Sequence, residues 1–193
     1  PFMSCQVSVA DTVRNAGRLV KEGRAQAVKL EGGAEFFDEV RALVRASIPV
    51  LGQLGLTPQS VNALGGYKVQ GKSLAAAQKL LDDARAVQEA GAFSLVLECV
   101  PAALAARITR ELEIPVIGIG AGPDCDGQVL VWQDMLGLND GGTPKFVRRF
   151  GAVGEAAREA FTAYAREVRQ GTYPAREHCY SMEGEAELLE KLY

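Results

Sequence analysis

Four polar side chains lie at or near the ends of otherwise apolar segments of this 193-residue chain: Lys29, Glu31, Gln53 and Glu98. Burying a charged group among apolar neighbours costs free energy unless the group has a partner or a function. Carboxylates, an amine and an amide are also the groups that bind metals and small acids or transfer protons. Their placement therefore makes these four residues candidates for a functional site.

Glu98 has the chemistry of a general base. It follows Leu95-Val96-Leu97 and precedes Cys99-Val100, so its surroundings are apolar. Removal from water raises the pKa of a carboxylate, which suits a base that works near neutral pH. The alternative is a core glutamate whose charge is balanced by a lysine of a neighbouring strand, such as Lys29.

Glu31 and Lys29 share one face of the segment Ala25–Gly33 if that segment is a strand, because side chains alternate along a strand. Glu31 could bind a hard divalent cation such as Mg²⁺, which often takes one or two protein carboxylates together with water and substrate oxygens. Lys29 could neutralise a substrate carboxylate or an oxyanion. The alternative is an edge strand that carries an ion pair.

Two other features carry weaker signals. The glycine-rich segment Gly118–Gly122 could bind a phosphate, although a tight turn explains its glycines equally simply. His178 is the only histidine and adjoins Cys179, but sequence neighbours in a tail rarely form a catalytic pair. We do not expect a site at that pair.

The elements that must position these residues alternate between strands and helices. The apolar patterns predict strands over 25–31, 48–53, 93–98 and 114–122, and helices over 8–23, 34–46, 73–90, 101–112 and 153–170. A long loop is expected at 56–71, a loop with a short helix at 124–138, a last strand or extended segment at 144–146, and an acidic helical stretch at 183–192.

This alternation requires a parallel sheet, as in a doubly wound fold or a (β/α)₈ barrel. The polar residues at the strand ends favour the barrel, because a barrel gathers the carboxyl ends of its strands around one mouth. The predicted fold class is therefore α/β, a TIM-type barrel.

Composition narrows the function. The net charge of −3 argues against a partner that is a nucleic acid or a membrane surface. No apolar run approaches the roughly 20 residues that span a bilayer. No signal peptide is recognisable, so we expect a cytoplasmic protein. The four cysteines are widely scattered, which fits neither a disulfide framework nor a zinc site.

Several motifs, in this order along the chain, closely resemble those of ketopantoate hydroxymethyltransferase (3-methyl-2-oxobutanoate hydroxymethyltransferase). The motifs are Lys29-Leu-Glu-Gly-Gly33, Leu54-Gly-Leu-Thr-Pro-Gln-Ser60, Gly65-Gly-Tyr-Lys-Val-Gln-Gly71, Leu97-Glu-Cys-Val-Pro101, Ile117-Gly-Ile-Gly-Ala-Gly122 and Asp126-Gly-Gln128. The likeness continues through Pro144-Lys-Phe146 and into the tail, so it covers essentially the whole chain.

The resemblance implies a (β/α)₈ barrel that binds Mg²⁺ and transfers a hydroxymethyl group from 5,10-methylenetetrahydrofolate to 3-methyl-2-oxobutanoate in pantothenate and coenzyme A biosynthesis. In the implied mechanism the metal binds the 2-oxo acid and stabilises its enolate. Glu98 is then the proton acceptor, Glu31 a metal ligand and Lys29 a substrate-binding residue, with Gln53 lining the pocket. The resemblance also implies a homo-oligomer, which is a decamer in the family.

The chain departs from the family pattern in two ways. Gln53 stands where the family usually has a histidine. The chain also has 193 residues, whereas a (β/α)₈ barrel takes about 250. We therefore expect residues 1–193 to form a single barrel domain without its N-terminal strands, which carry further metal-binding and substrate-binding groups in the family. A helical tail should begin at about residue 151.

Two hypotheses follow for function. One is an enzyme of this family whose sequence is recorded incompletely. The other is a truncated, catalytically inactive barrel that acts at most as a binding or assembly module. Residues 1–193 alone should be inactive and prone to aggregate, because an open barrel exposes strand edges and apolar helix faces.

Overall fold

The computed structural model describes residues 2–139, 141–182 and 189–190. It divides into two compact units. The first comprises Pro1–Leu130 with Pro144–Val147, and the second comprises Val131–Thr143 with Arg148–Tyr193. The candidate site residues all belong to the first unit.

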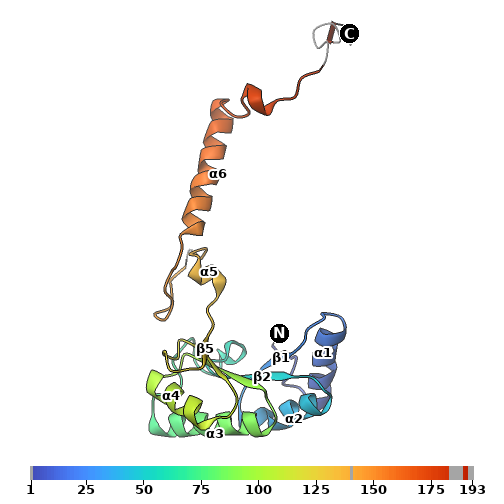
Figure 1. The fold of residues 1–193 in the computed structure, drawn as a ribbon, viewed down its shortest axis with the longest axis vertical. Coiled ribbons are helices and arrows are strands. Elements are labelled where there is room, and N and C mark those ends of the chain that lie inside the picture. The colour runs from blue at the N-terminus through green and yellow to red at the C-terminus, as the bar shows by residue number, and fades with distance from the viewer. Residues whose placement is uncertain (1, 140, 183–188, 191–193) are drawn as a thin grey trace. The chain divides into compact units, whose positions relative to one another are not determined.

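The first unit contains a parallel sheet whose strands follow one another in chain order (Figure 1). The strands are β1 (Val28–Glu31), β2 (Val50–Gly55), β3 (Ser94–Glu98), β4 (Val116–Ile119) and β5 (Gly127–Gln128). A doubly wound sheet would reverse its strand order at a switch point, and this sheet does not. The α/β class and the barrel type of winding are therefore confirmed. Within the described residues the sheet stays open, because β1 pairs only with β2 and β5 only with β4.

Helices alternate with these strands, and the caps explain where several begin. They are α1 (Val9–Lys21), α2 (Phe37–Arg45), α3 (Leu74–Glu89) and α4 (Ala102–Glu111). Ser8 and Ser73 cap α1 and α3, each accepting a hydrogen bond from the backbone N–H three residues later. Gly91, with φ +99°, lies two residues beyond the end of α3.

One face of the sheet is apolar and packs against α2, α3 and α4, which lie together on one side of the sheet in Figure 1. Pairing places Leu30, Gly52, Leu95 and Val116 in one row across the first four strands. Gly52 lets α3 approach closely, because a Cβ atom there would lie 2.5 Å from Cγ1 of Val87. The hydrophobic core is therefore formed between this face and the helices.

The opposite face carries the polar residues. The neighbouring row consists of Glu31, Gln53, Val96 and Ile117, and Glu98 follows Val96 on the same face two residues later. In a barrel with helices outside, this is the inward face.

The second unit contains α5 (Trp132–Met135) and the long helix α6 (Val153–Gln170), which ends at Gly171 in the left-handed conformation. The predicted helix at 153–170 is thus confirmed, but none of its residues is buried. Among the described residues, no helix is long and apolar enough to cross a membrane. The acidic helix predicted at 183–192 lies mostly outside the described residues.

One local prediction was wrong and another was incomplete. Residues 144–146 form no strand, and a turn begins at Lys145. The segment 124–138 contains the predicted short helix, which is α5, and in addition the strand β5. Its register is favoured by Asp126, whose Oδ2 accepts a hydrogen bond from the N–H of Val116 at 2.8 Å. The prediction of one barrel domain with a tail from about residue 151 stays a prediction.

Candidate active site

The carboxyl ends of β1, β2 and β3 bring three of the predicted residues together. Glu31 is paired with Gln53 across the β1–β2 ladder. Nε2 of Gln53 donates a hydrogen bond to Oε2 of Glu98 at 2.8 Å. The sequence-based expectation that these side chains meet on one face of the sheet is confirmed.

Burial raises the pKa of the Glu98 carboxyl above its ordinary value. The positive charge of Lys29 and the hydrogen bond from Gln53 oppose this rise, whereas the negative charge of Glu31 adds to it. Glu98 is therefore a carboxylate that accepts protons more readily than an exposed glutamate does. Such a pKa suits a general base.

Glu31 is nearly buried, and its position is fixed by the loop that follows β2. Oε2 of Glu31 accepts a hydrogen bond from the backbone N–H of Gln59 at 3.0 Å. The chain then turns at Gly32, whose φ of +119° favours glycine. Glu31 is thus a carboxylate held by a backbone donor at the mouth of the sheet.

The turn after Glu31 is also held from the helix side. Asp83 of α3 is buried, and its Oδ1 accepts a hydrogen bond from the N–H of Ala34 at 3.2 Å. A Cβ atom on Gly33 would lie 2.4 Å from Cγ of Asp83, so only glycine allows this approach. Lys79 pairs with the same aspartate at 2.6 Å.

Lys29 is exposed and acts on Glu98 through its charge. Within the part of the chain that the structure describes, it forms no ion pair with Glu31 or Glu98, so the ion-pair alternative is not what the structure shows. Lys29 lines a hollow of about 560 Å³ beside β1, which Val28 and Leu30 also line. Glu31, Gln53 and Glu98 do not line this hollow.

The backbone just after Glu98 adopts an uncommon conformation. Cys99 has φ +50°, which is sparsely populated by residues other than glycine. Its carbonyl accepts a hydrogen bond from the N–H of Gln70 at 2.9 Å, and the carbonyl of Glu98 accepts one from the N–H of Leu56 at 2.8 Å. The loop at 56–71 is therefore anchored beside Glu98 at both ends.

The glycine-rich segment at the end of β4 is a tight turn. Gly120 and Gly122 have φ of +64° and +84°. A Cβ atom at Gly120 would lie 2.8 Å from the ring of Phe146, and one at Gly122 would lie 2.4 Å from Cβ of Ala102. Close packing and backbone conformation explain these glycines, which favours the simpler of the two interpretations.

Glu31 and Glu98 are the carboxylates described at this mouth, and Glu31 is the candidate metal ligand. No group of three or more His, Cys, Asp or Glu side chains among them could hold a metal ion. Glu31 nonetheless has the donor type that Mg²⁺ prefers, and Mg²⁺ commonly completes its shell with water and substrate oxygens. The site therefore fits Mg²⁺ as a single protein contact.

Sequence reasoning missed two contributors to the site. Asp83 was not singled out, because an aspartate four residues after Lys79 in a helix has the spacing of an ordinary surface ion pair. Gln59 acts through its backbone, which no side-chain pattern reveals. Its place in a long loop after a strand was the available signal, since such loops often carry functional groups.

Comparison with known proteins gives a consistent result. A sequence model described as ketopantoate hydroxymethyltransferase matches residues 1–176. Two proteins named 3-methyl-2-oxobutanoate hydroxymethyltransferase, from Clostridium novyi (strain NT) and Enterococcus faecalis (strain ATCC 700802 / V583), are 57% and 58% identical over 193 residues. These matches cover 100% of this chain and 70% of each relative. A crystal structure of phosphonopyruvate hydrolase is similar at TM-score 0.49 and 13% identity, covering 97% of this chain and 66% of that one.

Proposed function

Because the chain belongs to the ketopantoate hydroxymethyltransferase family, we propose that it adds a hydroxymethyl group to 3-methyl-2-oxobutanoate, with Glu98 as the base. The observation that carries this proposal is the environment of Glu98. Its carboxylate is partly buried, has a raised pKa, and lies at a strand end beside Lys29 and Glu31. A base, a cation and a carboxylate for a hard metal therefore meet at one mouth.

Each residue of the site has a proposed role that suits its chemistry. Lys29 binds the carboxylate of the 2-oxo acid, because an exposed ammonium can neutralise that charge. Glu98 removes the proton from the carbon next to the ketone. Glu31 would hold Mg²⁺, which when bound supplies a Lewis acid for the keto oxygen. The loop at 56–71 keeps Glu31 in place through Gln59.

The one-carbon donor that we propose is 5,10-methylenetetrahydrofolate. The carbanion character created at the carbon next to the ketone requires an electrophilic one-carbon unit, and the methylene group of this folate supplies it. The homo-oligomer and the cytoplasmic location expected from the sequence stay predictions.

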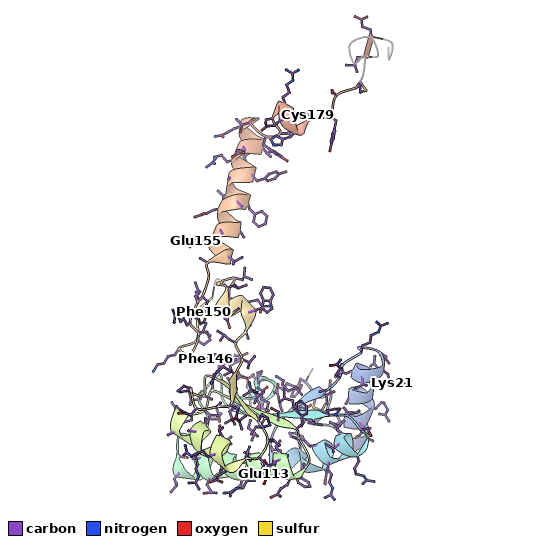
Figure 2. The ribbon with its side chains drawn as sticks, in the orientation of Figure 1. Lys21, Glu113, Phe146, Phe150, Glu155 and Cys179 are labelled. Carbon is purple, nitrogen blue, oxygen red and sulfur yellow. The ribbon has the colours of Figure 1, made fainter. Side chains whose placement is uncertain are left out.

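The test is a turnover assay of the full-length protein with 3-methyl-2-oxobutanoate, methylenetetrahydrofolate and Mg²⁺, repeated after chelation of the metal. We expect product formation that EDTA abolishes and Mg²⁺ restores. Glu98→Gln should lower kcat by a factor on the order of a hundred to ten thousand, the usual contribution of a general base. The matched control is Glu113→Gln, which alters an exposed glutamate that precedes β4 at the opposite end of the strands (Figure 2).

Two results would count against the proposal. Unchanged turnover in Glu98→Gln would remove Glu98 from the role of base. A folded protein with no turnover in any of these conditions would support the alternative of an inactive binding or assembly module.

A further inference from the structure

Gln53 is almost completely enclosed, with 1% of its surface exposed. Nε2 donates to Oε2 of Glu98 at 2.8 Å and to the carbonyl oxygen of Leu56 at 3.2 Å. Both neighbours are acceptors, so the NH₂ group must face them. The reversed amide would place its oxygen against a carboxylate and a carbonyl. The orientation of Gln53 is therefore fixed by its surroundings.

This contact distinguishes the two oxygens of Glu98. Oε2 is held by Gln53, whereas Oε1 has no hydrogen-bond partner among the described residues. A glutamate side chain ordinarily samples several rotamers, and one strong hydrogen bond to a rigid buried donor restricts it. Oε1 is the atom left available to a substrate.

We propose that Gln53 is a positioning residue that holds Oε2 of Glu98, so that Oε1 takes the proton. The inference rests on the proposed function of Glu98 as the base. In the step, the C–H bond next to the ketone breaks, and the proton goes to Oε1. The electron pair of that bond forms a carbon–carbon double bond, and the keto oxygen gains the negative charge. Gln53 donates to Oε2 throughout and transfers no proton.

A glutamine suits this task because its amide does not ionise. The charged or titratable groups around Glu98 are Lys29 and Glu31 on β1 and the adjacent Cys99 thiol, whose pKa is raised by burial. Gln53 adds no titration to this set. It favours the ionised form of Glu98 at every working pH, because a hydrogen bond to a carboxylate stabilises its charge.

The experiment isolates proton removal by the full-length protein, by following deuterium exchange at the carbon next to the ketone of 3-methyl-2-oxobutanoate. Exchange is measured by NMR in D₂O with Mg²⁺ and without folate, as a function of substrate concentration and pH. Gln53→Met keeps the length of the side chain but removes the donor. We expect its maximal exchange rate to fall by a factor of roughly ten to a hundred, the usual effect of losing a hydrogen bond to a charged group.

Three further readouts separate positioning from a structural role. KM should change little in Gln53→Met, because Gln53 contacts the base and not the substrate. The acid limb of the pH profile should move to higher pH, because the ionised carboxylate has lost a donor. Gln53→His, which restores a ring N–H donor, should recover most of the rate. The matched control is Gln78→Met, which changes an exposed glutamine of α3.

The outcomes are distinct. Unchanged maximal rate and pH profile in a folded Gln53→Met protein would overturn the proposal, as would a loss that Gln53→His does not recover. If Gln53→Met does not fold, the test rests on Gln53→His alone. For that variant we expect an exchange rate near that of the wild type and a second titration in the pH profile of exchange. Normal exchange in Glu98→Gln would instead overturn the proposed function, whatever the Gln53 variants do.

Discussion

The two faces of the β1–β4 sheet differ in the side chains that they carry and in how those side chains are stabilised. On the helix-covered face, the side chains of Leu30, Leu95, Leu97 and Val116 are buried and apolar, and their neighbours come from α2, α3 and α4. On the opposite face, the strand ends carry charged and amide groups, and each fully buried side-chain nitrogen or oxygen described there has a hydrogen-bond partner. The first face is stabilised by close packing of apolar side chains, whereas the polar groups of the second face require specific hydrogen-bond or charge partners.

A change on the helix-covered face should therefore affect stability, whereas a change on the polar face should affect chemistry. Removing volume from the helix-covered face should destabilise the fold through a cavity. Removing a group from the polar face should alter binding or proton transfer and leave the core intact.

Leu97→Ala should produce the largest loss of stability. Leu97 is completely buried in β3, next in sequence to Glu98 but on the other face. Loss of a buried leucine costs about 2–5 kcal/mol of unfolding free energy, because transfer and cavity effects add. Urea unfolding measures the change. Leu74→Ala, at a leucine that is 88% exposed at the start of α3, is the matched control and should cost far less. Equal losses in the two variants would contradict the description of the core.

Lys29→Met should weaken substrate binding without weakening the fold. Loss of a charge-assisted contact should raise KM for the 2-oxo acid by a factor of roughly ten to a hundred. Because Lys29 lowers the pKa of Glu98, the acid limb of the rate profile should also move to higher pH. The thermal melt should stay near that of the wild type, since Lys29 is exposed. Lys21→Met, at an exposed lysine of α1 (Figure 2), is the control. A large fall in stability with unchanged KM would break the division between the faces.

Asp83→Asn tests a residue that links the faces, because it lies on α3 and holds the turn after Glu31. The amide keeps the size of the side chain but loses the charge that Lys79 pairs with. We expect a loss of about 1–3 kcal/mol of unfolding free energy. We also expect weaker binding of Mg²⁺, seen as a higher Mg²⁺ concentration for half-maximal turnover. Asp82→Asn changes the neighbouring exposed aspartate and should have a small effect. If Asp82→Asn matches Asp83→Asn in stability and Mg²⁺ dependence, the buried contact has no special role.

The sequence was sufficient for the apolar face and for most elements. Continuous apolar runs identify buried strands such as 94–98, and Ser73 marks the start of α3 because its side chain caps the first turn. The two-residue strand β5 was missed, since two residues carry no periodicity. The turn at Lys145 was missed because apolar neighbours such as Phe146 also suit a strand. The ring of Phe146 packs instead against Gly120.

For the site, residue types indicated which side chains are candidates for function, but not which hydrogen bonds and packing contacts position them. The placement of Glu31 and Glu98 at strand ends predicted that they lie at one mouth, because a barrel gathers the carboxyl ends of its strands. The bond between Gln53 and Glu98 depends on the register of β2 with β3, which a single sequence does not reveal. Asp83 is far from the site in sequence, and only the packing of α3 brings it to Gly33.

The smallest expected effect is a pH-dependent gain of stability in Glu98→Gln. Burial raises the pKa of Glu98 in the folded state above its value in the unfolded chain, so the folded state binds this proton more tightly. The resulting stabilisation is fully present below the unfolded pKa and is lost as pH rises through the folded pKa. Glutamine is uncharged at every pH and keeps an oxygen that can accept the hydrogen bond from Gln53.

Relative to the wild type, Glu98→Gln should therefore be more stable at neutral pH than at a pH below the unfolded pKa. The gain is limited, because Lys29 and Gln53 already favour the ionised form. Urea unfolding of both proteins at the two pH values measures the difference, and Glu113→Gln, at an exposed glutamate, should show no such trend. If Glu98→Gln is instead destabilised more at neutral pH than in acid, the carboxylate is stabilised in the folded protein. The desolvated base inferred from the polar face would then be wrong.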